Sequence, residues 1–272
     1  NKFPEPVKAV PVPTDNGLPG CFPLMEKSRL RERFCHFLLY LELKLFHMSL
    51  KKKIIYINAI LVMTCIMSQA AFAQKGARKL GWQLGAQAWS FNKFTFAQAL
   101  DKVDSCGMKF IEAFPGQQIG GGIAGTMDYH MDAATRKAVL KMVKAHGIRL
   151  VSFGVVIAKD SADWEQLFKF GKAMGLENIV SEPKESDIPM ISRMCDRYKI
   201  NLAIHDHPQP SHYWNPDILL AAIKGASPRV GACADTGHWT RSGLDPLECL
   251  KKLRGHVKEF HFKDLNEKSP EA

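Results

Sequence analysis

The chain has 272 residues, of which 46% are hydrophobic and 24% charged, so it can form one large core and is not disordered throughout. Its formal net charge of +10 is divided along the chain, and residues 74–272 hold 27 basic and 22 acidic residues without a basic block of five or more. The charge therefore indicates a mixed solvated surface, and we expect no binding of nucleic acid.

The segment 48–73 has the order of a secretory signal peptide. Three lysines, Lys51 to Lys53, precede an apolar run, and Ala71-Phe72-Ala73 forms a small-x-small cleavage site. The apolar run is interrupted by Asn58, Thr64 and Ser68, and it is short for a membrane span of about 20 residues. We expect cleavage after Ala73, an exported periplasmic or secreted protein, and no stable membrane span after cleavage.

Residues 1–47 lie upstream of this signal and begin without Met. We expect them to be an upstream extension that is not part of the mature protein. Residues 74–272 would then form the mature domain. Its four cysteines, at positions 106, 195, 233 and 249, are too sparse for a disulfide scaffold, so we expect them to be buried small hydrophobic residues.

Seven short apolar runs in the mature region predict strands. They are Leu80–Trp89, Met108–Phe114, Ile148–Val156, Asn178–Glu182, Asn201–His205, Val230–Asp235 and Val257–Lys263. A cluster of three glycines, Gly120 to Gly122, follows the second run and opens no helix directly, so we interpret it as a flexible loop rather than a dinucleotide-binding turn.

Six stretches with helical spacing lie between these runs. They are Phe94–Ser105, Asp132–His146, Ala162–Met174, Ile188–Arg197, Pro216–Lys224 and Pro246–Leu253. In the second stretch Val139 and Val143 belong to an apolar stripe, Asp132 can cap the start, and Gly147 can close the end.

Alternation of strand and helix predicts a parallel sheet, either an open doubly wound sheet or an eightfold (β/α) barrel. Polar residues gather at the C-terminal ends of several strands, as a TIM barrel with its site on that face requires. The 199 residues from Gln74 onward are fewer than the roughly 250 of a typical barrel, and they stop just after strand seven. We therefore expect a (β/α)8 TIM barrel that is C-terminally truncated.

Strand alternation places His205 and His207 on one face, while Asp206 points to the opposite face or outward. Asp235 ends the sixth strand, and the Thr-Gly turn after it brings His238 back over the same opening. His261 and Lys263 share a face of the seventh strand.

Carboxylate and imidazole ligands without a required thiolate suit Mn²⁺, Mg²⁺, Co²⁺ or Zn²⁺. We expect one divalent metal ion. Its predicted ligands are Glu182, His205, Asp235 and His261.

The motifs Asp235-Thr-Gly-His238 and His261-Phe-Lys-Asp264, each at a strand end, resemble those of the xylose isomerase-like TIM barrel superfamily, which includes sugar phosphate isomerases and epimerases. The resemblance implies that Asp235 and His261 bind the metal and that His238 contacts substrate or a second ion. It places His205 where epimerases commonly have a Glu, and the last Glu ligand of the family lies beyond Ala272.

The resemblance implies a sugar isomerase or epimerase that abstracts a proton next to a metal-polarised carbonyl. The base is Glu182, His205 or a residue beyond the given sequence. Predicted substrate contacts are Trp89, Glu112, His207, His238 and Lys263. For Trp89, stacking on a sugar and a place in the core are equally compatible with the sequence.

Three alternatives stay open. They are a lyase or hydrolase of oxidised glycosides, an endonuclease-like phosphodiesterase, and a carbohydrate-binding barrel without catalysis. A homo-oligomer is compatible with the sequence.

Overall fold

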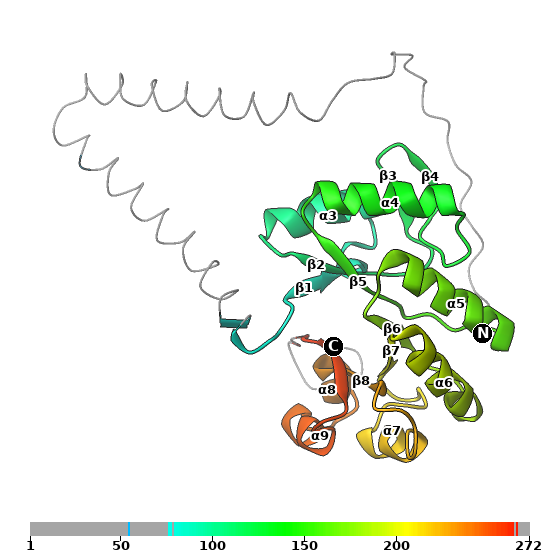
Figure 1. Ribbon diagram of the computed structural model, residues 1–272. Coiled ribbons are helices and arrows are strands. Elements are labelled where there is room, and N and C mark those ends of the chain that lie inside the picture. The colour runs from blue at the N-terminus through cyan, green and yellow to red at the C-terminus, as the bar shows by residue number, and fades with distance from the viewer. Residues whose placement is uncertain (1–53, 55–75, 78, 264, 266–272) are drawn as a thin grey trace, which may run out of the picture. The chain divides into compact units, whose positions relative to one another are not determined.

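Seven parallel strands form the sheet that organises the protein in its computed structural model, which describes residues 54, 76–77, 79–263 and 265 (Figure 1). The predicted extension 1–47, and the predicted signal peptide 48–73 apart from Ile54, lie outside the described residues. The other described residues belong to one compact unit, residues 70–272. None of the described helices has the length and apolar character that a membrane crossing needs.

The strands of this sheet follow the chain order, with every neighbouring pair parallel. They are β1 (Gly85–Gln87), β2 (Phe110–Ala113), β5 (Arg149–Phe153), β6 (Asn178–Ser181), β7 (Asn201–His205), β8 (Val230–Asp235) and β9 (Val257–His261). Each lies within one of the seven predicted runs. The parallel α/β architecture predicted from the sequence is therefore confirmed.

The sheet is curled rather than flat. In a flat sheet of this order β2 and β9 would lie about 24 Å apart, since neighbouring strands are about 4.8 Å apart. Instead, His261 on β9 lies 2.7 Å from Glu112 on β2, and Glu259 on β9 lies 2.6 Å from Ser152 on β5. The strands thus wrap around a shared interior as in a TIM barrel, which fits the predicted fold class.

Helices cover the outer side of the curled sheet (Figure 1). They are α3 (Phe96–Ser105), α4 (Ala133–Ala145), α5 (Ser161–Met174), α6 (Ile188–Tyr198), α7 (Pro216–Ala222), α8 (Thr236–Arg241) and α9 (Pro246–Lys252), with 3-10 turns η1 (Ala88–Phe91) and η2 (Glu185–Asp187). All six predicted helices are present. Their apolar faces and the outward side chains of the strands form one large core.

Local signals set the helix ends. The Asp132 side chain accepts a hydrogen bond from the Thr135 N–H at the start of α4, and Gly147 after its end has a φ of 64°. The Asp160 carboxylate accepts bonds from the N–H groups of Ala162 and Asp163 at the start of α5. Val139 and Val143 are buried, as the stripe on α4 predicts.

Two expectations about local structure were wrong. The glycine cluster forms the turn of a hairpin between β3 (Gln118–Gly120) and β4 (Ile123–Thr126), because Gly120, Gly121 and Gly122 adopt φ values of 70°, 61° and 82° that suit a glycine turn. Cys106 is exposed at the end of α3, whereas Cys195, Cys233 and Cys249 are buried as expected.

Candidate metal centre

The polar residues at the strand ends meet at one rim of the curled sheet. Glu182 directly follows β6, and His205, Asp235 and His261 are the last residues of β7, β8 and β9. The register pairs Asp235 with His261 on adjacent strands. Because parallel strands end at the same edge, four strands deliver their terminal side chains to one place.

Three of the four predicted ligands surround a common point. His205 Nε2 lies 3.7 Å from Asp235 Oδ2 and 3.3 Å from His261 Nδ1, and the last two atoms are 3.7 Å apart. Around a tetrahedral ion with bonds of about 2.1 Å, neighbouring ligand atoms lie about 3.4 Å apart. The spacing of these two nitrogens and one oxygen therefore fits a single divalent cation.

A positively charged side chain already contacts Asp235 Oδ2. The Lys263 ammonium lies 2.6 Å from Asp235 Oδ2 and 3.2 Å from His238 Nε2. Asp235 itself is fully buried, so its negative charge needs such a partner. Burial alone would raise the pKa of Asp235, but His261, His238 and Lys263 outweigh it and hold that pKa well below its usual value.

Glu182 lies on the other edge of the His205 ring. Its Oε1 is 3.8 Å from His205 Nδ1 and is hydrogen-bonded to His207 Nδ1, while its Oε2 accepts a 2.5 Å bond from Ser211 Oγ. The structure thus brings Glu182 to His205 on the side away from Asp235 and His261. Burial acts to raise the pKa of Glu182, but His205, His207 and Ser211 lower it overall, so the carboxylate stays ionised.

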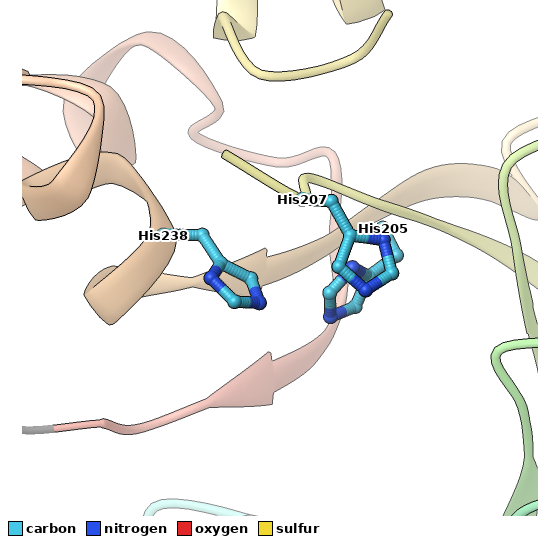
Figure 2. Close-up of side chains that lie close together, drawn as sticks. All are labelled: His205, His207 and His238. Atoms are coloured by element: carbon cyan, nitrogen blue, oxygen red, sulfur yellow. The ribbon is translucent and has the colours of Figure 1, made fainter. Parts of the chain in front are cut away.

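His205 lies between Glu182, at its Nδ1 edge, and the pair Asp235 and His261, at its Nε2 edge. It is 2% exposed, and burial lowers its pKa, so the ring is neutral near pH 7 and a nitrogen lone pair is available. Figure 2 shows His207 and His238 beside it, and one ring nitrogen of each of the three residues lies within 4.8 Å of the others. His207 is the most open of the three, with a side chain that is 45% exposed.

His238 reaches the rim from the first turn of α8. The Asp235 side chain caps this helix by accepting a 3.1 Å bond from the His238 N–H, so the predicted Thr-Gly turn is the start of a helix. Burial, with the Lys263 charge, lowers the pKa of His238 to about 3. His238 is therefore a neutral side chain beside both Asp235 and Lys263, with its Nε2 3.5 Å from Asp235 Oδ2.

The two remaining predicted contacts lie elsewhere. Glu112 is 4% exposed and lies behind His261, with its Oε2 2.7 Å from His261 Nε2. Trp89 belongs to η1, is 57% exposed and packs edge-on against Phe114 at a centroid distance of 5.0 Å. Trp89 is thus outside the buried core, and its predicted role in stacking on a sugar stays a prediction.

Sequence reasoning missed three polar residues of this interior. Cys233 and Glu259 lie two residues before Asp235 and His261 on the same strands, and the period of two could have identified both. Asp206 was predicted to point to the opposite face or outward, and of these two placements the outward one is wrong, because Asp206 is 3% exposed and its Oδ1 accepts a 2.7 Å bond from the Asp235 N–H. No sequence signal distinguishes a buried Asp206 from an outward one.

Comparisons with known proteins identify the fold through solved structures. No known protein-family profile matches the chain, and no curated protein matches it. An uncharacterised protein of Parabacteroides distasonis with a crystal structure is 33% identical, with a TM-score of 0.61, over 68% of this chain and 75% of that one.

Two more distant structures share the fold. A xylose isomerase-like TIM barrel protein from Mycobacterium smegmatis, in complex with magnesium, is 13% identical with a TM-score of 0.54, over 67% of this chain and 75% of that one. A D-psicose 3-epimerase is 17% identical with a TM-score of 0.50, over 62% and 67% of the two chains. The chain therefore belongs to the family of the Parabacteroides distasonis protein, and its fold is that of the xylose isomerase-like TIM barrels.

Proposed function

We propose that this protein is an exported, divalent-metal-dependent isomerase or epimerase of a sugar or sugar derivative. The observation that carries the proposal is the triangle of His205 Nε2, Asp235 Oδ2 and His261 Nδ1, whose edges are 3.3 to 3.7 Å. The D-psicose 3-epimerase that shares the fold supports the reaction class. Export rests on the predicted signal peptide, residues 48–73.

In this proposal His205, Asp235 and His261 bind the cation. A cation bound there would polarise a substrate carbonyl and acidify the hydrogen on the neighbouring carbon. Two imidazoles and one carboxylate suit Zn²⁺, Co²⁺ or Mn²⁺, and a harder ion such as Mg²⁺ would bind mainly through Asp235 and water.

Glu182 is the proposed proton acceptor. Its carboxylate is held by His207 on one oxygen and by Ser211 on the other, so its direction is fixed. A cavity of about 470 Å³ opens beside it, lined by Glu182, Pro183, Lys184, Glu185, His212 and Tyr213. This volume suits a small molecule such as a sugar. A substrate in this cavity would present its carbon to Glu182, and its carbonyl would extend past the His205 ring to reach the cation site.

His207, His238 and Lys263 are the proposed contacts to substrate hydroxyl groups. All three lie around the rim, and His238 is hydrogen-bonded to Lys263 at 3.2 Å. Trp89 is exposed and could supply an apolar surface for a sugar ring.

A lyase that removes a group next to a keto carbon is the second candidate. The imidazole of His205 favours a lyase. An epimerase of the usual kind places one carboxylate on each side of the reacting carbon, whereas β7 of this protein ends in His205. Elimination begins with the same proton abstraction. The mass of the product separates the two, since isomerisation leaves it unchanged.

The test is deuterium exchange from D₂O into a panel of ketoses and keto-sugars. We expect exchange with the metal-loaded protein, its loss after chelation, and its recovery when Zn²⁺, Mn²⁺ or Co²⁺ is restored. Glu182→Gln should slow exchange by about 10²- to 10⁴-fold, because the general base is removed.

Glu248→Gln is the matched control. Glu248 lies on α9, is 63% exposed and pairs with Lys251 at 2.7 Å, and it does not line the cavity beside Glu182. This variant should retain the exchange rate. A metal-loaded protein that exchanges no proton into any member of the panel would contradict the proposed function.

A further inference from the structure

Glu112 lies directly behind one of the proposed metal ligands. It is on β2, is 4% exposed, and its Oε2 is 2.7 Å from Nε2 of His261. The other ring nitrogen of His261, Nδ1, faces His205 and Asp235. The imidazole therefore has one edge on the cation site and the other on a buried carboxylate.

This contact determines which nitrogen of His261 carries hydrogen. An ionised carboxylate can only accept hydrogen bonds, so His261 Nε2 must donate. Nδ1 is then the nitrogen with a free lone pair when the ring is neutral, and it points at the proposed cation. We propose that Glu112 is a positioning residue that fixes His261 as an Nδ1 ligand. This inference rests on the cation site of the proposed function.

A cation bound among Glu112, Glu259 and His261 is the competing interpretation, since one ligand atom of each lies within 4.8 Å of the others. The contacts of Glu259 argue against it. Glu259 Oε2 accepts bonds from Ser152 Oγ at 2.6 Å and Asn178 Nδ2 at 3.0 Å, so neutral donors already occupy this oxygen, and burial with the Glu112 charge raises the pKa of Glu259 to about 8. Glu112, in contrast, has His261 as its hydrogen-bond partner.

A purely structural role does not explain the surroundings of Glu112. Its Oε1 is buried and has no hydrogen-bond partner among the described residues, which costs folding free energy. Glu112 is also poorly placed to contact a substrate, because its side chain lies on the edge of His261 that faces away from Asp235. Orientation of a metal-binding histidine by a carboxylate is a common arrangement, and its loss typically lowers metal affinity by about 10- to 100-fold.

Three variants separate the hydrogen bond from charge and packing. Glu112→Met removes the acceptor and keeps a side chain of similar length, and Glu112→Gln removes the charge but keeps an acceptor oxygen. Glu259→Gln is the matched control, because it removes a carboxylate from the same cluster and leaves the acceptor of His261 in place.

The full chain is titrated with Zn²⁺ against a competing chelator, and the imidazole N–H resonance of His261 is followed by NMR, assigned by its absence in His261→Gln. We expect one Zn²⁺ per chain in the wild type and a hydrogen-bonded Nε2–H resonance. Glu112→Met should lose that resonance and bind Zn²⁺ about 10- to 100-fold more weakly. Glu112→Gln and Glu259→Gln should retain the resonance and bind within about fivefold of the wild type.

Other outcomes overturn the inference in distinguishable ways. One Zn²⁺ per chain with unchanged affinity and resonance in a folded Glu112→Met would refute the positioning role and leave the proposed function standing. Two Zn²⁺ per chain, one of them lost in both Glu112→Met and Glu259→Gln, would favour the competing site. A wild type that binds no divalent cation would refute the proposed function and this inference together.

Discussion

At the scale of single residues, Asp206 holds the backbone of Asp235, one of the proposed metal ligands. Its Oδ1 accepts a 2.7 Å bond from the Asp235 N–H, and its Oδ2 has no hydrogen-bond partner among the described residues. Burial, with the nearby Asp235 charge, raises the pKa of Asp206 to about 9. The buried carboxyl is thus protonated at neutral pH, and it fixes the backbone that presents Asp235.

Asp206 should make the stability of the protein depend on pH. Its folded pKa of about 9 lies above the ordinary value of 3.8, so the folded state retains a proton that the unfolded chain releases. Unfolding free energy should therefore fall as pH rises from 4 to 9, by as much as about 1.4 kcal/mol per pH unit. Asp206→Asn keeps the acceptor and removes the titration, so its slope in urea unfolding at pH 5, 7 and 9 should be flatter.

Asp196→Asn is a suitable control for this measurement, because Asp196 is exposed and its side chain accepts a 2.6 Å bond from the neutral Ser227 hydroxyl. The pH dependence of its unfolding free energy should match that of the wild type. If the unfolding free energy of Asp206→Asn changed with pH as steeply as that of the wild type, the assignment of a buried neutral carboxyl would be wrong.

At the scale of elements, Gly231 lets β8 approach the chain just before β9. A Cβ atom at this position would lie 1.9 Å from the backbone oxygen of His256. The close approach belongs to the same strand pair that sets Asp235 opposite His261. The register of two proposed ligands thus depends on a glycine four residues before the first of them.

Gly231→Ala should destabilise the protein by more than about 2 kcal/mol, since backbone rather than a flexible side chain must move. Gly171→Ala in α5 is the control, because the nearest atom to its Cβ is the mobile end of Ile200 at 3.0 Å. Thermal unfolding of both variants measures the difference. Equal melting temperatures would show that the β8–β9 contact does not constrain the register.

The sequence predicts regular elements well and interior contacts poorly. Alternation and caps identify the helices and strands because these signals are local, as Asp132 and Gly147 on α4 illustrate. The hairpin after β2 escaped prediction because three glycines permit a turn as readily as a loop. Which edge of His205 faces Glu182 depends on the packing of three strands, and no local pattern encodes it.

At the scale of the whole molecule, the curl of the sheet makes the site. It brings β9 against β2 and β5, so His261 meets Glu112 and Glu259 meets Ser152 across the interior. The same fold occurs in a xylose isomerase-like TIM barrel protein from Mycobacterium smegmatis. A cation held by β7, β8 and β9 would join three strands, and saturation at about 100 times its Kd would stabilise the fold by about 2.7 kcal/mol.

The most direct test of the central claim is anomalous diffraction from crystals of the protein soaked in Zn²⁺ or Mn²⁺. We predict one strong peak within bonding distance, about 2.0 to 2.3 Å, of His205 Nε2, Asp235 Oδ2 and His261 Nδ1 together. Lys263 should move away from Asp235, since both cannot hold the same oxygen. A peak bound elsewhere, or none at these three atoms in fully soaked crystals, would contradict a shared cation at this rim.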